Sequence, residues 1–259
     1  MDPIWSLRVG QGPIIATAIH DGHDLRPDIA SIMALSDEDR LREEDPFTRG
    51  WTSVVSTRVV GTHSRFQVDL NRPRDKAVYR MPEDAWGLHV WSRAPSNDIV
   101  QASLAEYDGF YSAVKGLLEQ VNSTYGPFVV FDLHTYNHRR GGPGAAPADP
   151  RENPQVNVGT GTMQRGRWAP IVDRFIADLS HFDFPGGTLD VRENVKFQGG
   201  QFSRWVHETF PDSGCCLAVE FKKFFMDEWT GEPDKTLVQA ITDALRHATP
   251  GVLAELKHL

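Results

Sequence analysis

PFVVFDLH, at residues 127–134, is the stretch of sequence that decides the fold. It is an apolar run of β-branched and aromatic type that follows Gly126 and leads into a polar loop. Such a run is typical of a central strand that is buried on both faces of a sheet. Polar chemistry begins where this strand is expected to stop, because His134 is its last residue.

Strand-like and helical patterns alternate along the rest of the chain, which predicts an α/β sheet covered by helices on its faces. The clearest helix is expected at residues 96–123, where apolar residues recur at alternating spacings of four and three. The Gly-, Pro- and Ala-rich residues 141–154 are expected to form a surface loop. The other expected strands are residues 12–20, 52–60, 65–70 and 215–221, and the other expected helices are residues 168–179, 202–210 and 234–247.

The composition is that of an ordinary globular chain, with 259 residues of which 40% are hydrophobic and 24% charged. We expect one domain over residues 1–259, large enough to bury a core without disulfides, so Cys215 and Cys216 are interpreted as reduced core residues. The net charge of −8 and the scattered basic residues argue against a nucleic-acid partner. The sequence shows no signal-like start and no apolar run of membrane-spanning length, so a cytoplasmic location without membrane attachment is expected.

Three polar residues stand at the ends of expected strands that are far apart in the sequence. His20 ends the first strand, His134 ends the central strand, and Glu220 lies near the end of the strand at residues 215–221. In open α/β sheets, ligands bind beyond the carboxyl ends of the strands, so these side chains are expected to meet. Imidazole and carboxylate groups gathered in this way are typical of a catalytic zinc site, where a nearby carboxylate takes the proton of a water molecule.

Four segments in order resemble the N-formylglutamate amidohydrolase family: HDG at 20–22, HSRFQVDLNRP at 63–73, FDLH at 131–134 and LAVEFKKFFMDE at 217–228. The resemblance implies a distant relation to the zinc carboxypeptidases and to aspartoacylase. It therefore implies a zinc-carboxypeptidase-like, three-layer α/β sandwich with a mixed, mainly parallel central sheet. It also implies one catalytic Zn²⁺ ion and the hydrolysis of N-formyl-L-glutamate, or of a related small anionic N-acyl amino acid.

The resemblance favours His20 and His134 as metal ligands and leaves the third ligand open. His23 follows His20 by three residues, as the second ligand follows the first in the carboxypeptidases, although that group usually has Glu at this place. The alternative is an acid in the run Glu43–Asp45, of which Asp45 is preferred, because N-formylglutamate amidohydrolases tend to carry Asp there. Three imidazoles would be equally acceptable to zinc.

Amide hydrolysis also needs a proton acceptor and groups that hold the substrate. Glu220 is expected to accept the proton of the attacking water and to pass it to the leaving amine. Arg65 is a candidate to stabilise the oxyanion or to bind a second carboxylate. Asn71 and Arg72, which match an Asn-Arg pair of the wider group, are expected to hold the carboxylate of the amino acid.

Less specific interpretations stand beside these assignments. Glu220 could instead form a salt bridge with Lys222 or Lys223, and Asp69 is expected to orient Arg65 or the backbone. The alternative functions are a deacylase or carboxypeptidase-like hydrolase for another carboxylate substrate, or a binding protein that has kept the carboxylate clamp but lost turnover. A serine hydrolase is not expected, because the sequence contains no G-x-S-x-G motif.

Overall fold

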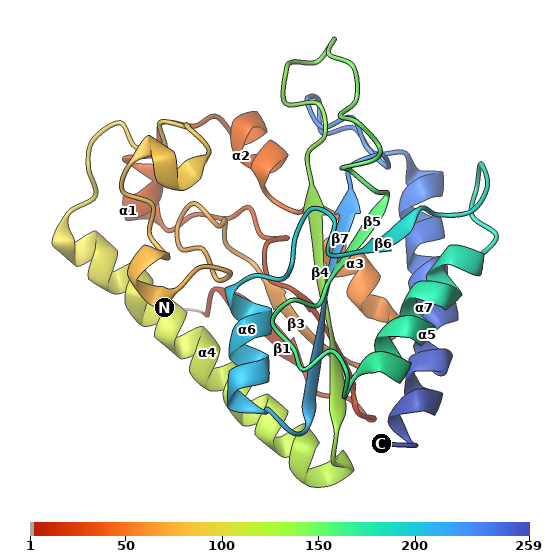
Figure 1. The fold of residues 1–259 in the computed structure, drawn as a ribbon. Coiled ribbons are helices and arrows are strands. Elements are labelled where there is room, and N and C mark those ends of the chain that lie inside the picture. Colours follow the sequence, from red (N-terminus) through yellow and green to blue (C-terminus); the bar gives the residue numbers. More distant parts are fainter. Residues whose placement is uncertain (1–2) are drawn as a thin grey trace.

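The computed structural model describes residues 3–259 and shows one mixed sheet of seven strands (Figure 1). The strand order is β1-β3-β2-β4-β7-β5-β6. Neighbouring strands are parallel except where β1 pairs with β3 and where β5 pairs with β7, so the expected mixed, mainly parallel sheet is confirmed. The strands are β1 (Trp5–Arg8), β2 (Ile14–Ala18), β3 (Thr57–Gly61), β4 (Phe128–Tyr136), β5 (Val156–Gly159), β6 (Val191–Glu193) and β7 (Gly214–Lys222).

Helices cover both faces of the sheet and complete three layers (Figure 1). α4 and α6 bury their apolar residues on one face, and α5 and α7 bury theirs on the other face together with α3. None of the helices within residues 3–259 has the length and apolar character needed to cross a membrane. The helices are α1 (Pro27–Ala30), α2 (Asp37–Glu43), α3 (Thr48–Trp51), α4 (Asn97–Tyr125), α5 (Ala169–His181), α6 (Gln201–Thr209) and α7 (Lys235–Leu256), with short 3-10 helices η1 (Thr52–Val54), η2 (Arg74–Lys76) and η3 (Pro82–Ala85).

The long helix α4 begins and ends at residues that suit these positions. The Ser96 hydroxyl accepts a hydrogen bond from the backbone N–H of Ile99 and so caps the amino end. Gly126 follows the last turn with φ of 77°, a conformation that favours glycine. The helix expected at residues 96–123 is therefore confirmed.

The central strand β4 divides its side chains between two environments. Residues 129, 131 and 133 enter the core under α5 and α7, whereas Phe128 and Val130 enter the core under α4 and α6. Because side chains alternate along a strand, Asp132 and His134 share the face of Phe128 and Val130. This face is thus apolar in its first half and polar in its second half, which places a polar site at the carboxyl edge of the sheet.

Several segments differ from the expectation. Residues 65–70 form turns rather than a strand, and the buried side chains of Gln67 and Asp69 bond to other segments. Residues 52–60 contain η1 before β3 begins. The sequence does not predict β1, β5 or β6, because strands of three or four residues are too short for a periodic pattern. Residues 141–154 contain neither helix nor strand, as expected for a loop.

Candidate metal centre and active site

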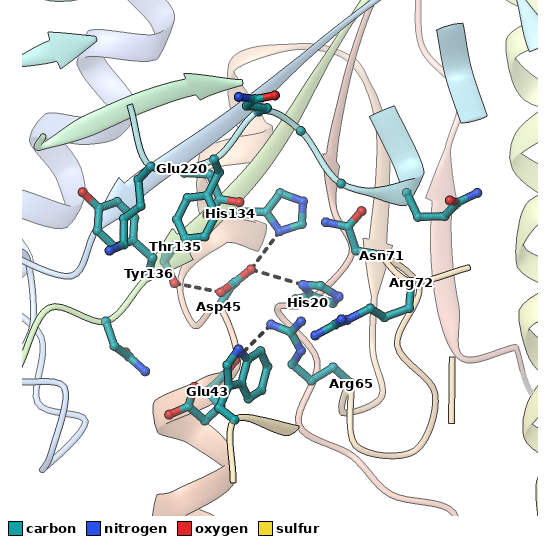
Figure 2. A pocket seen from close by; sticks show the side chains of 18 of the residues that line it. His20, Glu43, Asp45, Arg65, Asn71, Arg72, His134, Thr135, Tyr136 and Glu220 are labelled. Carbon is teal, nitrogen blue, oxygen red and sulfur yellow. Dashed lines mark hydrogen bonds and ion pairs between the residues drawn. The ribbon is translucent and has the colours of Figure 1, made fainter. Parts of the chain in front are cut away.

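His20, Asp45 and His134 each bring one ligand atom to a single buried place. His20 follows β2, Asp45 lies between α2 and α3, and His134 lies near the end of β4. Their ligand atoms all lie within 4.8 Å of one another, and all of these side chains are buried. Figure 2 shows both imidazoles pointing at the Asp45 carboxylate. The three residues are called the metal group below.

A second carboxylate holds the His20 imidazole on the side away from Asp45. Nε2 of His20 lies 2.8 Å from Oδ1 of Asp69, and Nδ1 lies 3.5 Å from Oδ2 of Asp45. The other oxygen of Asp69 accepts hydrogen bonds from Arg65, at 2.7 Å, and from the Tyr79 hydroxyl. Within the described chain, Nδ1 of His20 is buried without a hydrogen-bond partner. With its proton on Nε2, His20 therefore presents a free lone pair beside Asp45.

His134 also lies between two carboxylates, but its hydrogen bond is the one to Asp45, whereas its buried Nε2 has no hydrogen-bond partner within the described chain. Its Nδ1 lies 2.9 Å from Oδ2 of Asp45, and its Nε2 lies 3.1 Å from Oδ2 of Asp132. Oδ1 of Asp132 accepts a hydrogen bond of 2.7 Å from the Thr17 hydroxyl. Burial opposes the protonated form of His134, but the Asp132 and Asp45 carboxylates prevail and raise its pKa well above the ordinary value. A carboxylate behind a histidine fixes the ring and makes it a stronger metal ligand.

Asp45 is held through its backbone and through its second oxygen. Its N–H donates to the carbonyl of His20 at 2.9 Å, and the Thr135 hydroxyl donates to Oδ1 at 2.9 Å. Burial disfavours the charged carboxylate, yet the hydrogen bond with His134 and the nearby His20 imidazole keep the pKa of Asp45 well below its usual range. The anionic form is therefore the one that the site stabilises.

Lys223 supports the segment that carries Asp45. Its ammonium is buried and donates to the backbone carbonyls of Arg42 and Glu44, at 2.5 and 2.8 Å. Burial lowers the pKa of Lys223 to about 8, against the opposing effect of nearby carboxylates, Asp45 first among them. Residues 42–45 are thus fixed against the end of β7.

The donor set fits a divalent cation such as zinc. Two imidazole nitrogens and one carboxylate oxygen face a common point, and catalytic zinc sites use three ligands of this kind while leaving a position for water. Three buried carboxylates also meet here, namely Asp45, Asp69 and Asp132. Arg65 contacts Asp69 at 2.7 Å, and Arg72 lies 3.8 Å from the same oxygen. Buried charges of one sign are stable only when they are paired or bind a metal, so a cation would offset this excess.

Glu220 lies next to the metal group. It pairs with His134 across the β4–β7 ladder, and residues paired on neighbouring strands point to the same face. Burial is the main cause that raises the pKa of Glu220 to about 8. Lys222 and Lys223 donate instead to backbone carbonyls, so in the described structure neither lysine forms the alternative salt bridge with Glu220.

A cavity of about 720 Å³ opens over the metal group and is also lined by Glu220, Arg65, Asn71 and Arg72. Arg65 donates to Asp69, as expected, and to the carbonyl of Glu43 and the Tyr79 hydroxyl, which leaves two of its five N–H bonds free. Figure 2 shows Arg65, Asn71 and Arg72 on one side of the metal group.

Asn71 and Arg72 keep donors for a ligand. Oδ1 of Asn71 accepts a hydrogen bond of 2.9 Å from the N–H of Phe202, so the amide NH₂ is left unengaged by this contact. A side chain at Gly200 would come within 2.6 Å of Asn71, so glycine is needed where α6 begins. The Arg72 guanidinium is 37% exposed and reaches Asp69 only at 3.8 Å.

His23 lies outside the metal group. Its Nδ1 is 2.6 Å from a Glu44 oxygen and its Nε2 is 3.1 Å from an Arg40 nitrogen. The bond to Glu44 is the main cause that raises the pKa of His23, and the side chain is 38% exposed. The chain turns after His20, so the spacing of three residues does not bring His23 to Asp45, and we do not retain His23 as a ligand.

Several residues of this site are not predicted from the sequence. Asp132 has a local signal, since an Asp two residues before a His on one strand must share its face. No local sequence pattern indicates the remaining residues, because their positions depend on contacts between distant segments. These residues are Lys223, Arg140, Lys196 and Asn157.

Comparisons with known proteins agree with this geometry. The family model described as N-formylglutamate amidohydrolase matches residues 12–225. A solved structure of N-formylglutamate amidohydrolase from Ralstonia eutropha JMP134 is similar with a TM-score of 0.74 and 17% identity, covering 98% of each chain. A gene product from Agrobacterium tumefaciens is similar with a TM-score of 0.69 and 15% identity, covering 99% of this chain and 97% of that chain. No curated protein matches the sequence.

Proposed function

Because the chain belongs to the N-formylglutamate amidohydrolase family and is a hydrolytic enzyme acting on an amide, we propose that it is a zinc-dependent enzyme that releases formate from N-formyl-L-glutamate or a close N-acyl analogue. The observation that carries the proposal is the metal group beside Glu220. Three potential ligands, each fixed by further contacts, adjoin a carboxylate without a lysine partner. His20, Asp45 and His134 are the proposed metal ligands.

Glu220 has the proposed role of general base and then general acid. A bound zinc ion would lower the pKa of a water ligand to about 7 and polarise the amide carbonyl. The Glu220 carboxylate accepts the proton of the attacking water and returns it to the amide nitrogen as the C–N bond breaks. The raised pKa of Glu220 suits a group that must both take and give a proton near neutral pH.

Arg65 has the proposed role of stabilising the negative charge that develops on the carbonyl oxygen. Its guanidinium borders the cavity, is fixed by Asp69, and has N–H bonds left for a ligand. A donor that is fixed before the reaction needs no reorganisation, which makes such groups effective in catalysis.

Asn71 and Arg72 are proposed to hold the carboxylate next to the scissile amide. The fork of the Arg72 guanidinium matches the two oxygens of a carboxylate, and the Asn71 amide adds a neutral donor. Both residues lie beside Arg65 in Figure 2, so the amino-acid part of the substrate would lie on this side of the metal group.

The direct test uses purified protein with a known zinc content and measures formate release from N-formyl-L-glutamate, beside N-acetyl and N-succinyl amino acids. We expect formate release that depends on one equivalent of divalent metal. Protein that binds the metal and the amino acids but hydrolyses none of these amides would support the alternative of a binding protein and contradict the proposal.

A further inference from the structure

Lys196 lines the cavity without a carboxylate partner, a property that it shares with the exposed Arg204 and the buried Lys223 among the described residues. Arg65 is paired with Asp69, and the Arg140 guanidinium is paired with both oxygens of Glu43, at 3.2 and 3.0 Å. Within residues 3–259, the Lys196 ammonium forms no ion pair of 4.0 Å or less. It lies 5.4 Å from the centre of the Tyr136 ring. A cation that faces a cavity without a carboxylate partner is free to bind an anionic ligand.

The position of Lys196 is fixed by a buried side chain. Asn157, on β5, is fully buried, and its Oδ1 accepts the backbone N–H of Lys196 at 2.8 Å. Its Nδ2 donates to the carbonyl of Phe197 at 2.8 Å, so both sides of this peptide segment are tied to the sheet. Asn157 is the partner of Glu220 in the β5–β7 ladder. The loop that carries Lys196 is therefore held at the wall of the cavity that Glu220 belongs to.

The surroundings of Lys196 favour an anion. Partial burial and the Arg140 guanidinium lower the pKa of Lys196, although Glu152 opposes them. Lys196 and Arg140 lie close together and make this corner of the cavity positively charged. The Glu43 carboxylate pairs with Arg140 and not with Lys196. A carboxylate placed here would relieve the repulsion and gain a charge-assisted hydrogen bond.

This corner is separate from the Asn71–Arg72 clamp. The Lys196 ammonium lies over the Tyr136 ring. Figure 2 shows Tyr136 on the opposite side of the metal group from Arg72. The two cationic positions thus flank the metal group and Glu220. A cavity of about 720 Å³ is in the size range of sites for drug-sized ligands, so it has room for a substrate that reaches both.

We propose that Lys196 binds a second carboxylate of the substrate, so that the preferred substrates are amides with two carboxylates. The inference rests on the proposed amide hydrolysis and extends it to specificity. The second carboxylate has two possible sources, the side chain of the amino acid, as in a glutamyl substrate, or the acyl group, as in a succinyl amide. The chemistry at Lys196 is the same for both.

The test compares the wild type with Lys196→Met and Lys196→Arg, using two pairs of zinc-supplied assays. N-formyl-L-glutamate against N-formyl-L-glutamine tests the side-chain source, and N-succinyl-L-glutamine against N-butyryl-L-glutamine tests the acyl source. Lys235→Met is the matched control, because Lys235 is an exposed lysine at the start of α7 and is not among the cavity residues.

We expect Lys196→Met to raise KM about tenfold, or about 1.4 kcal/mol, for the two-carboxylate member of one pair. KM for the one-carboxylate member and kcat for both should change by less than about threefold, since the contact is made equally in ground and transition states. Lys196→Arg keeps the positive charge and should therefore have a KM close to that of the wild type. Lys235→Met should have the KM and kcat of the wild type. The pair that responds identifies the source of the carboxylate, and unchanged KM ratios in both pairs overturn the proposal.

Calorimetry separates this inference from the proposed function. We expect the wild type to bind L-glutamate more tightly than L-glutamine, or succinate more tightly than butyrate, and Lys196→Met to lose that preference. If the wild type hydrolyses none of the amides, the proposed function fails, and calorimetry alone decides the Lys196 site. The Lys196 proposal is overturned if the wild type binds the two members of each pair with equal affinity. It is also overturned if Lys196→Met keeps the preference of the wild type.

Discussion

The floor and the rim of the cavity are built differently. At the floor, the metal group is fixed on every side: carboxylates lie behind both imidazoles, and a hydroxyl and a backbone bond hold Asp45. At the rim, Arg72 and Lys196 have only weak or no contacts with protein carboxylates. The difference teaches that the chain fixes the buried end of the site in advance, whereas the charged groups at the rim keep donors that a ligand can bind.

Removal of the proposed metal should have the largest effect, because the proposed hydrolysis depends on a water molecule that the metal activates. Dialysis against a strong chelator should lower amide hydrolysis at least about 100-fold, since an unactivated water attacks amides poorly. One equivalent of zinc should restore the rate. Metal analysis and formate release check this together, and a fully active metal-free protein would remove the metal group from the mechanism.

Glu220→Gln tests whether the floor supplies the proton transfer. It should lower kcat about 10²- to 10⁴-fold, the usual contribution of general acid–base catalysis. Zinc content should be unchanged, since Glu220 is not a proposed ligand, and circular dichroism should report an intact fold. A near wild-type rate would exclude Glu220 as the base.

Asp132→Asn tests the support behind His134. The amide keeps the shape of the carboxylate but not its charge, so zinc affinity should fall about 10- to 100-fold. Competition with a chromogenic chelator measures this. Glu228→Gln is the matched control, since Glu228 is also buried but binds the N–H groups of His138 and Arg139. Equal losses of zinc affinity in both variants would contradict a specific role for Asp132.

Arg72→Ala tests the rim and should have the smallest effect of the four. We expect KM for N-formyl-L-glutamate to rise about tenfold and kcat to change less, because a partly exposed charge pair contributes modestly. Arg74→Ala is the control, since Arg74 forms a surface pair with Asp108. If kcat falls as much as kcat/KM, the clamp is also needed in the transition state.

The sequence predicts the layers and the floor better than the rim. The apolar run at 127–134 and the polar strand ends are sufficient to locate His20, His134 and Glu220, because parallel strands end at one edge of a sheet. The sequence cannot decide between His23 and Asp45, since that depends on how residues 21–45 fold back over β2. Asp45 donates its N–H to the carbonyl of His20, a tertiary contact with no local pattern.

The polar segment at residues 65–72 shows why such predictions fail. Its alternation resembles a strand, yet the side chain of Asp69 bonds to His20, Arg65 and Tyr79, and these contacts replace ladder pairing. The same segment supplies Asn71 and Arg72 to the rim. Tertiary hydrogen bonds, rather than ladder pairing, account for its conformation.

The metal group joins three segments that are distant in the sequence, and the backbone hydrogen bond from Asp45 to His20 holds two of them together. Because His20, Asp45 and His134 belong to segments that meet only after folding, an ion bound there would favour the native state by thermodynamic linkage. A bound ion would then raise the free energy of unfolding in addition to its role in hydrolysis. We expect the metal-free chain to be cleaved more readily by proteases near residues 42–45.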